Sequence, residues 1–418
     1  MPSYSAPGVY VVEAPSGAHP IGAVGTSTAA FLGVAPDAGA DVGEAHAVSN
    51  WTEFEQRYVR GAGQGTHLAS AVNGFFRNGG GRCWVVNLGD EGTLLGTAGS
   101  RGGLQQLDAI DEISMVAAPG MTDLASCSAL LQHCEDPLHQ DRVAILDVPH
   151  PLGPDDVERL TRVATDSSPA DDPPGRAEGG AAPARAASRA GSDSGGLRAP
   201  ASADGYGALY GPWLRVQDPV TGATVVCPPS GHVAGIWART DTTRGVHKAP
   251  ANAAVVGALG LTYPFSRGDQ EVLNPAGVNC IRYFTSEGIM LWGARTLAPA
   301  SSPWRYVNVR RLVNMLKESI ADSTRWIVFE PNDEVLWRSV RRDVGAFLTQ
   351  VWRDGALFGA TPQEAFFVKC DAETNPKDVR DAGQLVAIIG IAPVQPAEFV
   401  IFRIMQSADS ADVQPSGV

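Results

Sequence analysis

The segment His67–Leu88, HLASAVNGFFRNGGGRCWVVNL, has the pattern of a helix followed by a turn and a buried strand. His67–Arg77 carries apolar residues at helical spacing, and the glycines at 79–81 are typical of a helix C-terminus and the turn after it. Cys83–Leu88 is nearly all apolar, which is typical of a strand covered on both faces. The segment therefore predicts one unit of an α/β fold.

The same alternation extends on both sides of this segment. Thr26–Val34 is an apolar, strand-like run, and Ile113–Ala118 and Val143–Val148 are two more buried strands. Between the last two, Thr122–Cys134 has a helical pattern, with Thr122 or Asp123 as its N-cap. Helices that alternate with nearly all-apolar strands predict a parallel sheet with helices on both faces.

A change of composition interrupts this pattern at residues 166–205. The stretch consists of Pro, Ala, Gly, Ser, Asp, Arg and other small or charged residues, and Leu197 is its one large apolar residue. Such a segment cannot bury enough apolar surface to offset the entropy cost of ordering it. We therefore predict a disordered surface insertion over 166–205.

The second half of the chain mixes strands and helices. Val272–Leu297 has the alternation of a hairpin, and the stretches 309–320 and 334–353 keep an apolar stripe at helical spacing. The remaining predicted elements are a strand-like run Tyr206–Val216, strands at Trp326–Phe329, Phe366–Lys369 and Leu385–Ile391, and a short helical turn after Asn375-Pro376. The whole chain is therefore expected to be an α/β and α+β multidomain protein.

The composition limits the possible functions. The 418 residues carry a formal net charge of −13 and are 44% hydrophobic, which fits a folded protein of two or three domains. Because there is no basic surplus, we expect neither nucleic-acid binding nor docking on anionic membranes. The start, MPSYSAPGVY, does not resemble a signal peptide, and no run approaches the roughly 20 apolar residues of a membrane span. We therefore expect no membrane insertion and synthesis in a cytoplasm.

The cysteines and the absent motifs argue against a cofactor or metal. None of the six cysteines forms a C-x-x-C pair, and although His133 and His139 lie near Cys127 and Cys134, further clustered ligands would be needed for a metal site. We interpret the cysteines as buried apolar residues in a reducing compartment. The chain also lacks a nucleotide P-loop, an H-E-x-x-H motif and a G-x-S-x-G motif.

One stretch, ARTDTTRGVHKAPAN at 238–252, has the residue mix of a catalytic loop. In an enzyme, His247 could act as a base oriented by Asp241, with Lys248 or Arg244 holding an anion. The stretch offers no nucleophile beyond common threonines, so we favour a conformationally fixed structural loop. Its charged members are Arg239, Asp241, Arg244, His247 and Lys248.

Both ends of the chain carry strand-like segments, Tyr4–Glu13 and Phe399–Ile404. A strand at an exposed terminus offers unpaired backbone groups to any sheet edge. It could add to the sheet of a neighbouring copy or pair within its own subunit. The pattern alone leaves both possibilities open.

Several motifs, in order along the chain, resemble one family. They are PGVYVVEAPSGAHPIGAVGTSTAAFLG (Pro7–Gly33), NGGGRCWVV (Asn78–Val86), PPSGHVAGIWARTDTTRGVHKAPAN (Pro228–Asn252), WRYVNVRRLVNMLKESI (Trp304–Ile320), the stretch from NDEVLWRSVRR to FFVKCD (Asn332–Asp371) and GIAPVQPAEFVIFRI (Gly390–Ile404). Each is weak alone, but together they resemble the sheath subunit of contractile phage tails and of phage-tail-like injection particles.

The resemblance implies a domain organisation. An inner domain would combine an N-terminal arm, residues 1–25, with a C-terminal portion, residues 272–418. An outer α/β domain, residues 26–271, would be inserted between them and would carry the insertion 166–205. The two terminal strands would be exchanged between adjacent subunits, through Val9, Tyr10, Val11, Val12, Phe399, Val400, Ile401 and Phe402.

The resemblance also implies partners and a function. Many copies would form a helical sheath around an inner tube protein, together with baseplate and terminal cap proteins, and the particle would be assembled in a bacterial cytoplasm. Contraction of the sheath would drive the tube through a target envelope, without a catalytic site or cofactor. The alternatives are the α/β enzyme described above and a tail-tube or baseplate component. Basic residues expected off the apolar helix faces would contact the tube: Arg310, Arg311, Lys317, Arg338, Arg341 and Arg342.

Overall fold

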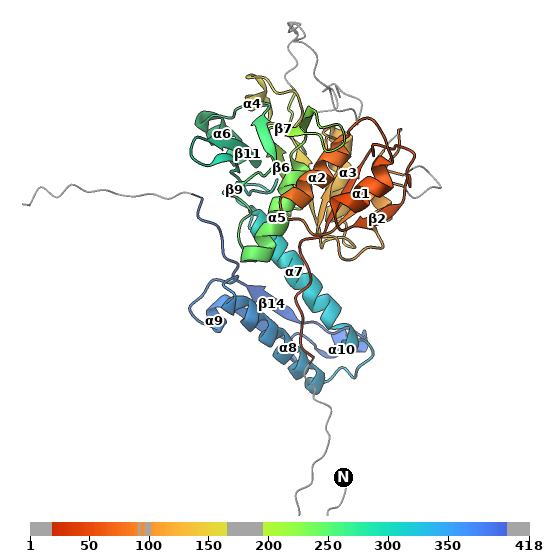
Figure 1. The fold of residues 1–418 in the computed structure, drawn as a ribbon. Coiled ribbons are helices and arrows are strands. Elements are labelled where there is room, and N and C mark those ends of the chain that lie inside the picture. Colours follow the sequence, from red (N-terminus) through yellow and green to blue (C-terminus); the bar gives the residue numbers. More distant parts are fainter. Residues whose placement is uncertain (1–18, 91–92, 97–101, 165–194, 399–418) are drawn as a thin grey trace, which may run out of the picture.

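The computed structural model describes residues 19–90, 93–96, 102–164 and 195–398. They form a large body built on a wide sheet and a smaller body that contains most of the C-terminal part of the described chain (Figure 1). Helix α7 (Val307–Ser323) runs from the large body into the small one. The predicted arm residues at 9–12 and 399–402 lie outside the described residues.

The large body contains a nine-stranded sheet in the order β2-β3-β1-β4-β5-β6-β11-β12-β9. Its central strands, from β3 to β11, are parallel, whereas β2, β12 and β9 pair antiparallel at the two sides. This agrees with the predicted parallel sheet. The strands are β1 (Ala29–Gly33), β2 (Ala45–Val48), β3 (Cys83–Asn87), β4 (Met115–Ala117), β5 (Val143–Asp147), β6 (Gly207–Gly211), β9 (Ala253–Ala254), β11 (Val278–Phe284) and β12 (Gly288–Leu291).

Each face of this sheet has its own apolar core. In β1, Ala29 and Phe31 face one core while Ala30 and Leu32 face the other, as the two-residue period of a strand requires. The first core is covered by α1 (Trp51–Phe54), η1 (Glu55–Val59), α2 (His67–Arg77) and α5 (Ser230–Arg244). The second is covered by η2 (Leu104–Leu107), α3 (Leu124–Glu135), α4 (Asp156–Arg159) and α6 (Arg267–Leu273).

Helices α2 and α5 approach each other closely because α5 has glycines at the contact. A Cβ on Gly231 would lie 2.3 Å from the Ala71 carbonyl oxygen, and one on Gly235 would lie 2.4 Å from that of Phe75. A larger side chain at either position would push the two helices apart. The β-hairpin predicted within Val272–Leu297 is confirmed as β11 and β12, which pair antiparallel.

A separate three-stranded antiparallel sheet lies on the large body. It consists of β10 (Ala258–Leu261), β7 (Leu214–Gln217) and β8 (Thr224–Cys227). The short η3 (Asn274–Ala276) leads from α6 into β11. Among the residues described, no helix is long and apolar enough to span a lipid bilayer.

The small body packs α7 and α8 (Glu334–Arg353) against a two-stranded sheet of β13 (Phe366–Lys369) and β14 (Ile388–Ile391). Its core includes Leu316, Val340 and Phe347, which belong to the predicted helical stripes. Short helices complete it: η4 (Arg325–Ile327), α9 (Pro362–Ala365) and α10 (Lys377–Asp381). The N-terminal segment 19–28 runs beside α7 from this body to β1 (Figure 1).

Three predictions about the fold need correction. The strand expected at Trp326–Phe329 is not formed, because the chain makes η4 there and then exposes Phe329 at a φ of 75°. Disorder to residue 205 is wrong for 195–205, where Ser202 is buried and short bridges join this stretch to residues 163 and 164. The domain boundary expected at residue 272 falls inside the large body, since β11 and β12 belong to its sheet.

Candidate assembly site at the junction of the two bodies

A buried ion pair joins α5 of the large body to α7. Arg311 donates from Nη1 to Asp241 Oδ1 at 2.9 Å and from Nη2 to Asp241 Oδ2 at 2.6 Å. The side chains are only 3% and 5% exposed. Two parallel charge-assisted hydrogen bonds fix both the distance and the orientation of the two helices.

The N-terminal segment completes this junction. Thr26 donates its hydroxyl to Asp241 Oδ2 at 2.7 Å, and its carbonyl oxygen accepts a hydrogen bond of 2.7 Å from Arg311 Nη2. The guanidinium also lies over the Trp237 ring, 4.8 Å from its centroid. Three segments that are distant in sequence therefore meet at one ion pair.

Arg310 and Arg311 do not lie on an exposed basic face, as the sequence pattern suggested. Both residues are 3% exposed. The Arg310 guanidinium lies 4.0 Å from the Trp304 ring centroid and 4.5 Å from that of Tyr206, and burial lowers its pKa. The apolar stripe of α7 faces the small body, while the large body covers the side that looked polar.

The stretch predicted as a loop is half helix. Residues 238–244, which include Arg239, Asp241 and Arg244, form the last turns of α5, and Gly245 follows at a φ of 88°. The helix brings Asp241 to Arg311, which sequence reasoning did not pair. Arg239 extends from the same helix and donates to the Ala254 carbonyl oxygen at 2.9 Å.

The catalytic arrangement considered for this stretch is not formed. Among the described residues Asp241 bonds to Thr26 and Arg311, and no hydrogen bond joins it to His247. Lys248 donates its ammonium to the carbonyl oxygens of residues 249 and 251 at 2.6 and 3.4 Å. Burial lowers the pKa of both His247 and Lys248. The Lys248 hydrogen bonds hold the chain in place after α5.

The other basic residues predicted as tube contacts lie on or near the surface. Arg338 and Arg342 are exposed on α8, and Arg342 pairs with Asp343 at 2.8 Å. Arg341 is half-buried and donates to the Cys370 carbonyl oxygen. Lys317, on α7, is exposed but donates to Gln140 of the large body at 3.1 Å.

The chain that leads to the predicted N-terminal arm is attached to the small body. His19 donates its backbone N–H to Asp343 Oδ2 at 3.3 Å, and its ring stacks on Trp326 with centroids 4.0 Å apart. Ile21 packs on the core of the small body, and Val24 donates its N–H to Ser319 Oγ at 3.0 Å. The base of this arm is therefore fixed on α7 and α8.

The base of the predicted C-terminal arm is attached to the large body. Arg295 donates to Glu398 through two hydrogen bonds of 2.7 and 2.5 Å, and the Tyr306 hydroxyl adds one of 3.2 Å. Burial alone would raise the pKa of Glu398, but these partners together lower it. Sequence reasoning missed this pair, because a contact between residues 103 positions apart leaves no local signal.

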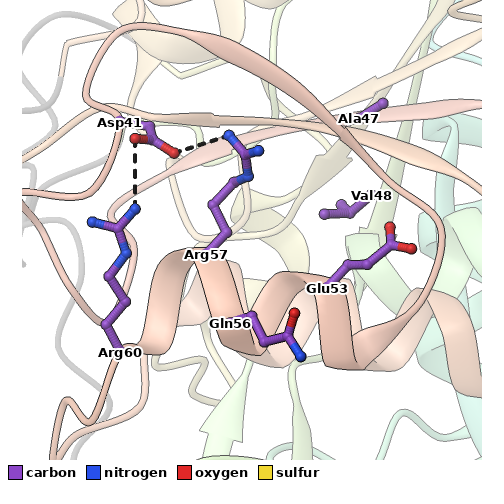
Figure 2. A pocket seen from close by; sticks show the side chains of 7 residues that line it. All are labelled: Asp41, Ala47, Val48, Glu53, Gln56, Arg57 and Arg60. Atoms are coloured by element: carbon purple, nitrogen blue, oxygen red, sulfur yellow. Dashed lines mark hydrogen bonds and ion pairs between the residues drawn. The ribbon is translucent and has the colours of Figure 1, made fainter.

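Two of the hollows on the described surface are lined by charged residues. The first, of about 510 Å³, lies beside edge strand β2, where Asp41 pairs with Arg57 at 3.0 Å and with Arg60 at 3.7 Å (Figure 2). These pairs attach the loop before β2 to η1.

The second hollow, of about 400 Å³, opens between the two bodies at the junction. Carboxylates line it from both sides: Asp111, Glu112 and Asp141 from the large body and Glu318 and Asp322 from α7. Burial, followed by the neighbouring Asp141, Asp111 and Asp322, raises the pKa of Glu318. The neighbouring carboxylates therefore repel Glu318 across the same junction, and Arg325, which pairs with Asp322 at 3.1 Å, offsets part of this repulsion.

Comparison with known proteins agrees with this architecture. The family model for the phage tail sheath protein central domain matches residues 201–297, and that for the phage tail sheath C-terminal domain matches 300–407. The tail sheath protein of Vibrio phage KVP40 is 30% identical over 188 residues, which are 44% of this chain and 27% of that protein. The tail sheath protein of Burkholderia phage BcepMu is 32% identical over 183 residues, 42% of this chain and 37% of that protein. The chain thus spans well under half the length of these two relatives.

Solved structures match along nearly the whole chain. The sheath of the extracellular contractile injection system PVC, in its contracted state, is 26% identical with a TM-score of 0.73, covering 98% of this chain and 99% of that one. The helical sheath of the anti-feeding prophage, also contracted, is 27% identical with a TM-score of 0.69, covering 97% and 100%. With both sheath domain models matched in order, the chain belongs to the contractile tail sheath protein family.

Proposed function

We propose that this chain is the structural subunit of a contractile sheath. Many copies polymerise helically around an inner tube, and contraction drives the tube through a target envelope. The observation that carries this proposal is the likeness to a contracted injection-system sheath over nearly the full length of both chains. Because the match covers both the large and the small body, it supports the same structural role for each of them in this chain.

The junction suits a subunit that moves as one piece. Contraction without a nucleotide requires that the contracted lattice makes more favourable contacts between subunits than the extended one. Such energy moves subunits efficiently only if each keeps its shape. The buried Arg311–Asp241 pair and its Thr26 contacts hold the large body, α7 and the N-terminal segment together.

The terminal arms are proposed as the links between copies. Residues 9–12 and 399–402 would add strands to the sheets of adjacent subunits. Strands β13 and β14 support this, because among the described residues they pair only with each other and so leave two open edges. The firm attachment of His19 and Glu398 would transmit force from each arm to its own subunit.

The tube contact is proposed for the exposed basic residues of the small body. Arg338 and Arg342 are the best placed, because both are exposed on α8. Arg341 and Lys317 are also proposed as tube contacts. Contacts between exposed charges are weak and screened by salt, which suits a sheath that must release the tube as it contracts. Baseplate and cap proteins would contact the two ends of the helical assembly.

We also propose a purely structural role, in a particle assembled in a bacterial cytoplasm. The side chains of Asp241 and Lys248 have structural partners, and no hydrogen bond joins Asp241 to His247 among the described residues, so no observation favours the enzyme alternative. The sheath role requires no cofactor.

Negative-stain electron microscopy of the purified full chain tests the proposal. We expect hollow helical tubes from the intact chain, and no tubes after residues 1–13 are replaced by a Gly/Ser linker of the same length. The linker variant keeps chain length and removes only the strand-forming side chains. Small uniform particles from both samples would contradict the sheath proposal, while tubes from both would contradict only the role of the N-terminal arm.

A further inference from the structure

Three potential ligand side chains gather at the C-terminal end of α3. Asp108 follows η2, His133 lies in the last turn of α3, and His139 lies in the loop that leads to β5. Their candidate ligand atoms all lie within 4.8 Å of one another. Asp108 Oδ1 is 3.5 Å from His139 Nε2 and 4.0 Å from His133 Nδ1, and the two rings stack with centroids 4.5 Å apart.

We propose that Asp108, His133 and His139 bind a divalent transition metal ion, with Zn²⁺ as the ion best suited to the site. Two imidazoles and one carboxylate are ligands that Zn²⁺ accepts, and water can fill a fourth position. Bonds of about 2.0–2.2 Å place the ligand atoms of a tetrahedral site roughly 3.3–3.6 Å apart. The Asp108–His139 distance already fits, and the Asp108–His133 distance must shorten by roughly 0.5 Å. The two stacked rings must also turn so that their lone pairs converge on the ion.

The burial of the three groups also suits a metal site. The side chains of His133 and His139 are 7% and 11% exposed, whereas that of Asp108 is 41% exposed and leaves a route from solvent.

His139 lacks good hydrogen bonds at both ring nitrogens. Its buried Nδ1 has no hydrogen-bond partner within the described part of the chain, and its Nε2 has only the distant Asp108 carboxylate. An ion bound at Nε2 would give that nitrogen the ligand bond it lacks, whereas Nδ1 would stay without a partner in the described part of the chain.

Arg142 opposes a cation here and limits the expected affinity. Its Nη1 lies 3.4 Å from His133 Nε2. Asp141 offsets the charge through hydrogen bonds of 2.7 and 3.2 Å, and carbonyl oxygens of residues 107 and 110 hold the rest of the guanidinium. A metal on His133 Nδ1 requires the ring proton on Nε2, so the long contact with Arg142 must relax slightly.

A bound ion would connect three segments of the large body near α7. It would tie the end of α3 to η2 and to the loop that carries Gln140, whose side chain accepts the hydrogen bond from Lys317. The metal would therefore stiffen the surface on which α7 rests. This inference concerns the chain's own residues and does not depend on the sheath proposal.

Zinc binding by the full chain, prepared without a histidine tag, tests the proposal. The protein is dialysed against Zn²⁺ and its metal content is measured by mass spectrometry. Co²⁺ absorption in the visible range reports the ligand geometry, and thermal unfolding with and without Zn²⁺ reports stabilisation. We expect one equivalent of Zn²⁺ and a higher Tm in its presence.

The variants Asp108→Asn and His139→Gln should bind Zn²⁺ about 10- to 100-fold more weakly, or worse. Asp108→Asn changes a partly exposed side chain, so circular dichroism should show an unchanged fold. His46→Gln is the matched control, because His46 also lies near two carboxylates, at 3.2 Å from Glu44 and 3.8 Å from Asp41. Substoichiometric binding, undiminished binding by Asp108→Asn, or an equal loss in His46→Gln would overturn the proposal.

Discussion

Breaking the Arg311–Asp241 pair from either side should destabilise the protein strongly. Asp241→Leu leaves the Arg311 guanidinium buried without a counter-charge, and Arg311→Met leaves the Asp241 carboxylate in the same state. Removing one partner of a buried pair typically costs about 3–5 kcal/mol. Both side chains here are at most 5% exposed, so the upper part of that range applies.

The double variant Asp241→Leu/Arg311→Met should lose less than the sum of its two single changes. It contains no unpaired buried charge, and apolar side chains can fill the space. What remains is the Thr26 hydroxyl without its Asp241 acceptor, which costs about 1–3 kcal/mol. The Thr26 carbonyl oxygen loses its Arg311 donor but keeps a hydrogen bond from the Ser114 hydroxyl. The two single changes would add to about 6–10 kcal/mol if they were independent, so the coupling should exceed roughly 3 kcal/mol.

Urea denaturation followed by tryptophan fluorescence measures these free energies of unfolding. Arg338→Met is the control, because it removes an exposed arginine from α8 and should change stability by less than about 0.5 kcal/mol. Single changes that cost under about 1 kcal/mol, or a double variant equal to their sum, would refute the view that this pair fixes the junction.

Three further predictions concern packing, pH and thiol reactivity. Gly231→Ala should lower the free energy of unfolding by about 2 kcal/mol or more, because its Cβ would meet the α2 backbone. Gly345→Ala has open space around it and should raise the free energy of unfolding by about 0.5–1 kcal/mol. Urea midpoints that shift in the same direction in both variants would contradict this. Glu318 binds its proton more tightly in the folded state than in the unfolded state, because folding raises its pKa. The free energy of unfolding should therefore fall as the pH rises from the ordinary glutamate pKa through the raised pKa of the folded state. Glu318→Gln should flatten that decline, and denaturation midpoints with an unchanged pH dependence would count against it. A thiol-reactive dye should label the native chain at least roughly 100-fold more slowly than the urea-unfolded chain, because all six cysteines are buried. Rapid labelling of the native chain would contradict this burial. The cysteines are Cys83, Cys127, Cys134, Cys227, Cys280 and Cys370.

Local patterns predicted the elements whose partners are close in sequence. The helix His67–Arg77 is α2 with the predicted bounds, and the buried strand after it is β3. Here the apolar spacing, the glycine turn and the all-apolar strand all favour the same structure. The strand expected at Trp326–Phe329 failed because four apolar residues fit either a strand or a short helical turn.

The site residues could not be predicted in the same way. Asp241 and Arg311 are separated by 70 positions, and a charged residue off the apolar stripe of a helix normally faces water. That expectation fails for α7 because two bodies cover it from different sides. Nothing local distinguishes buried Arg311 from exposed Arg338, so burial could be assigned only with the fold in hand.

The contacts at the junction divide the chain into parts that should stay fixed and parts that can change partners. Arg311 and Arg295 are buried and bound through two hydrogen bonds each, so separating them from Asp241 or Glu398 would leave buried charges. Arg338 and Arg342 are exposed, so they can exchange one counter-charge for another at little cost. If the sheath contracts as proposed, the subunit should therefore keep its internal junction and its arm attachments while its surface contacts are replaced.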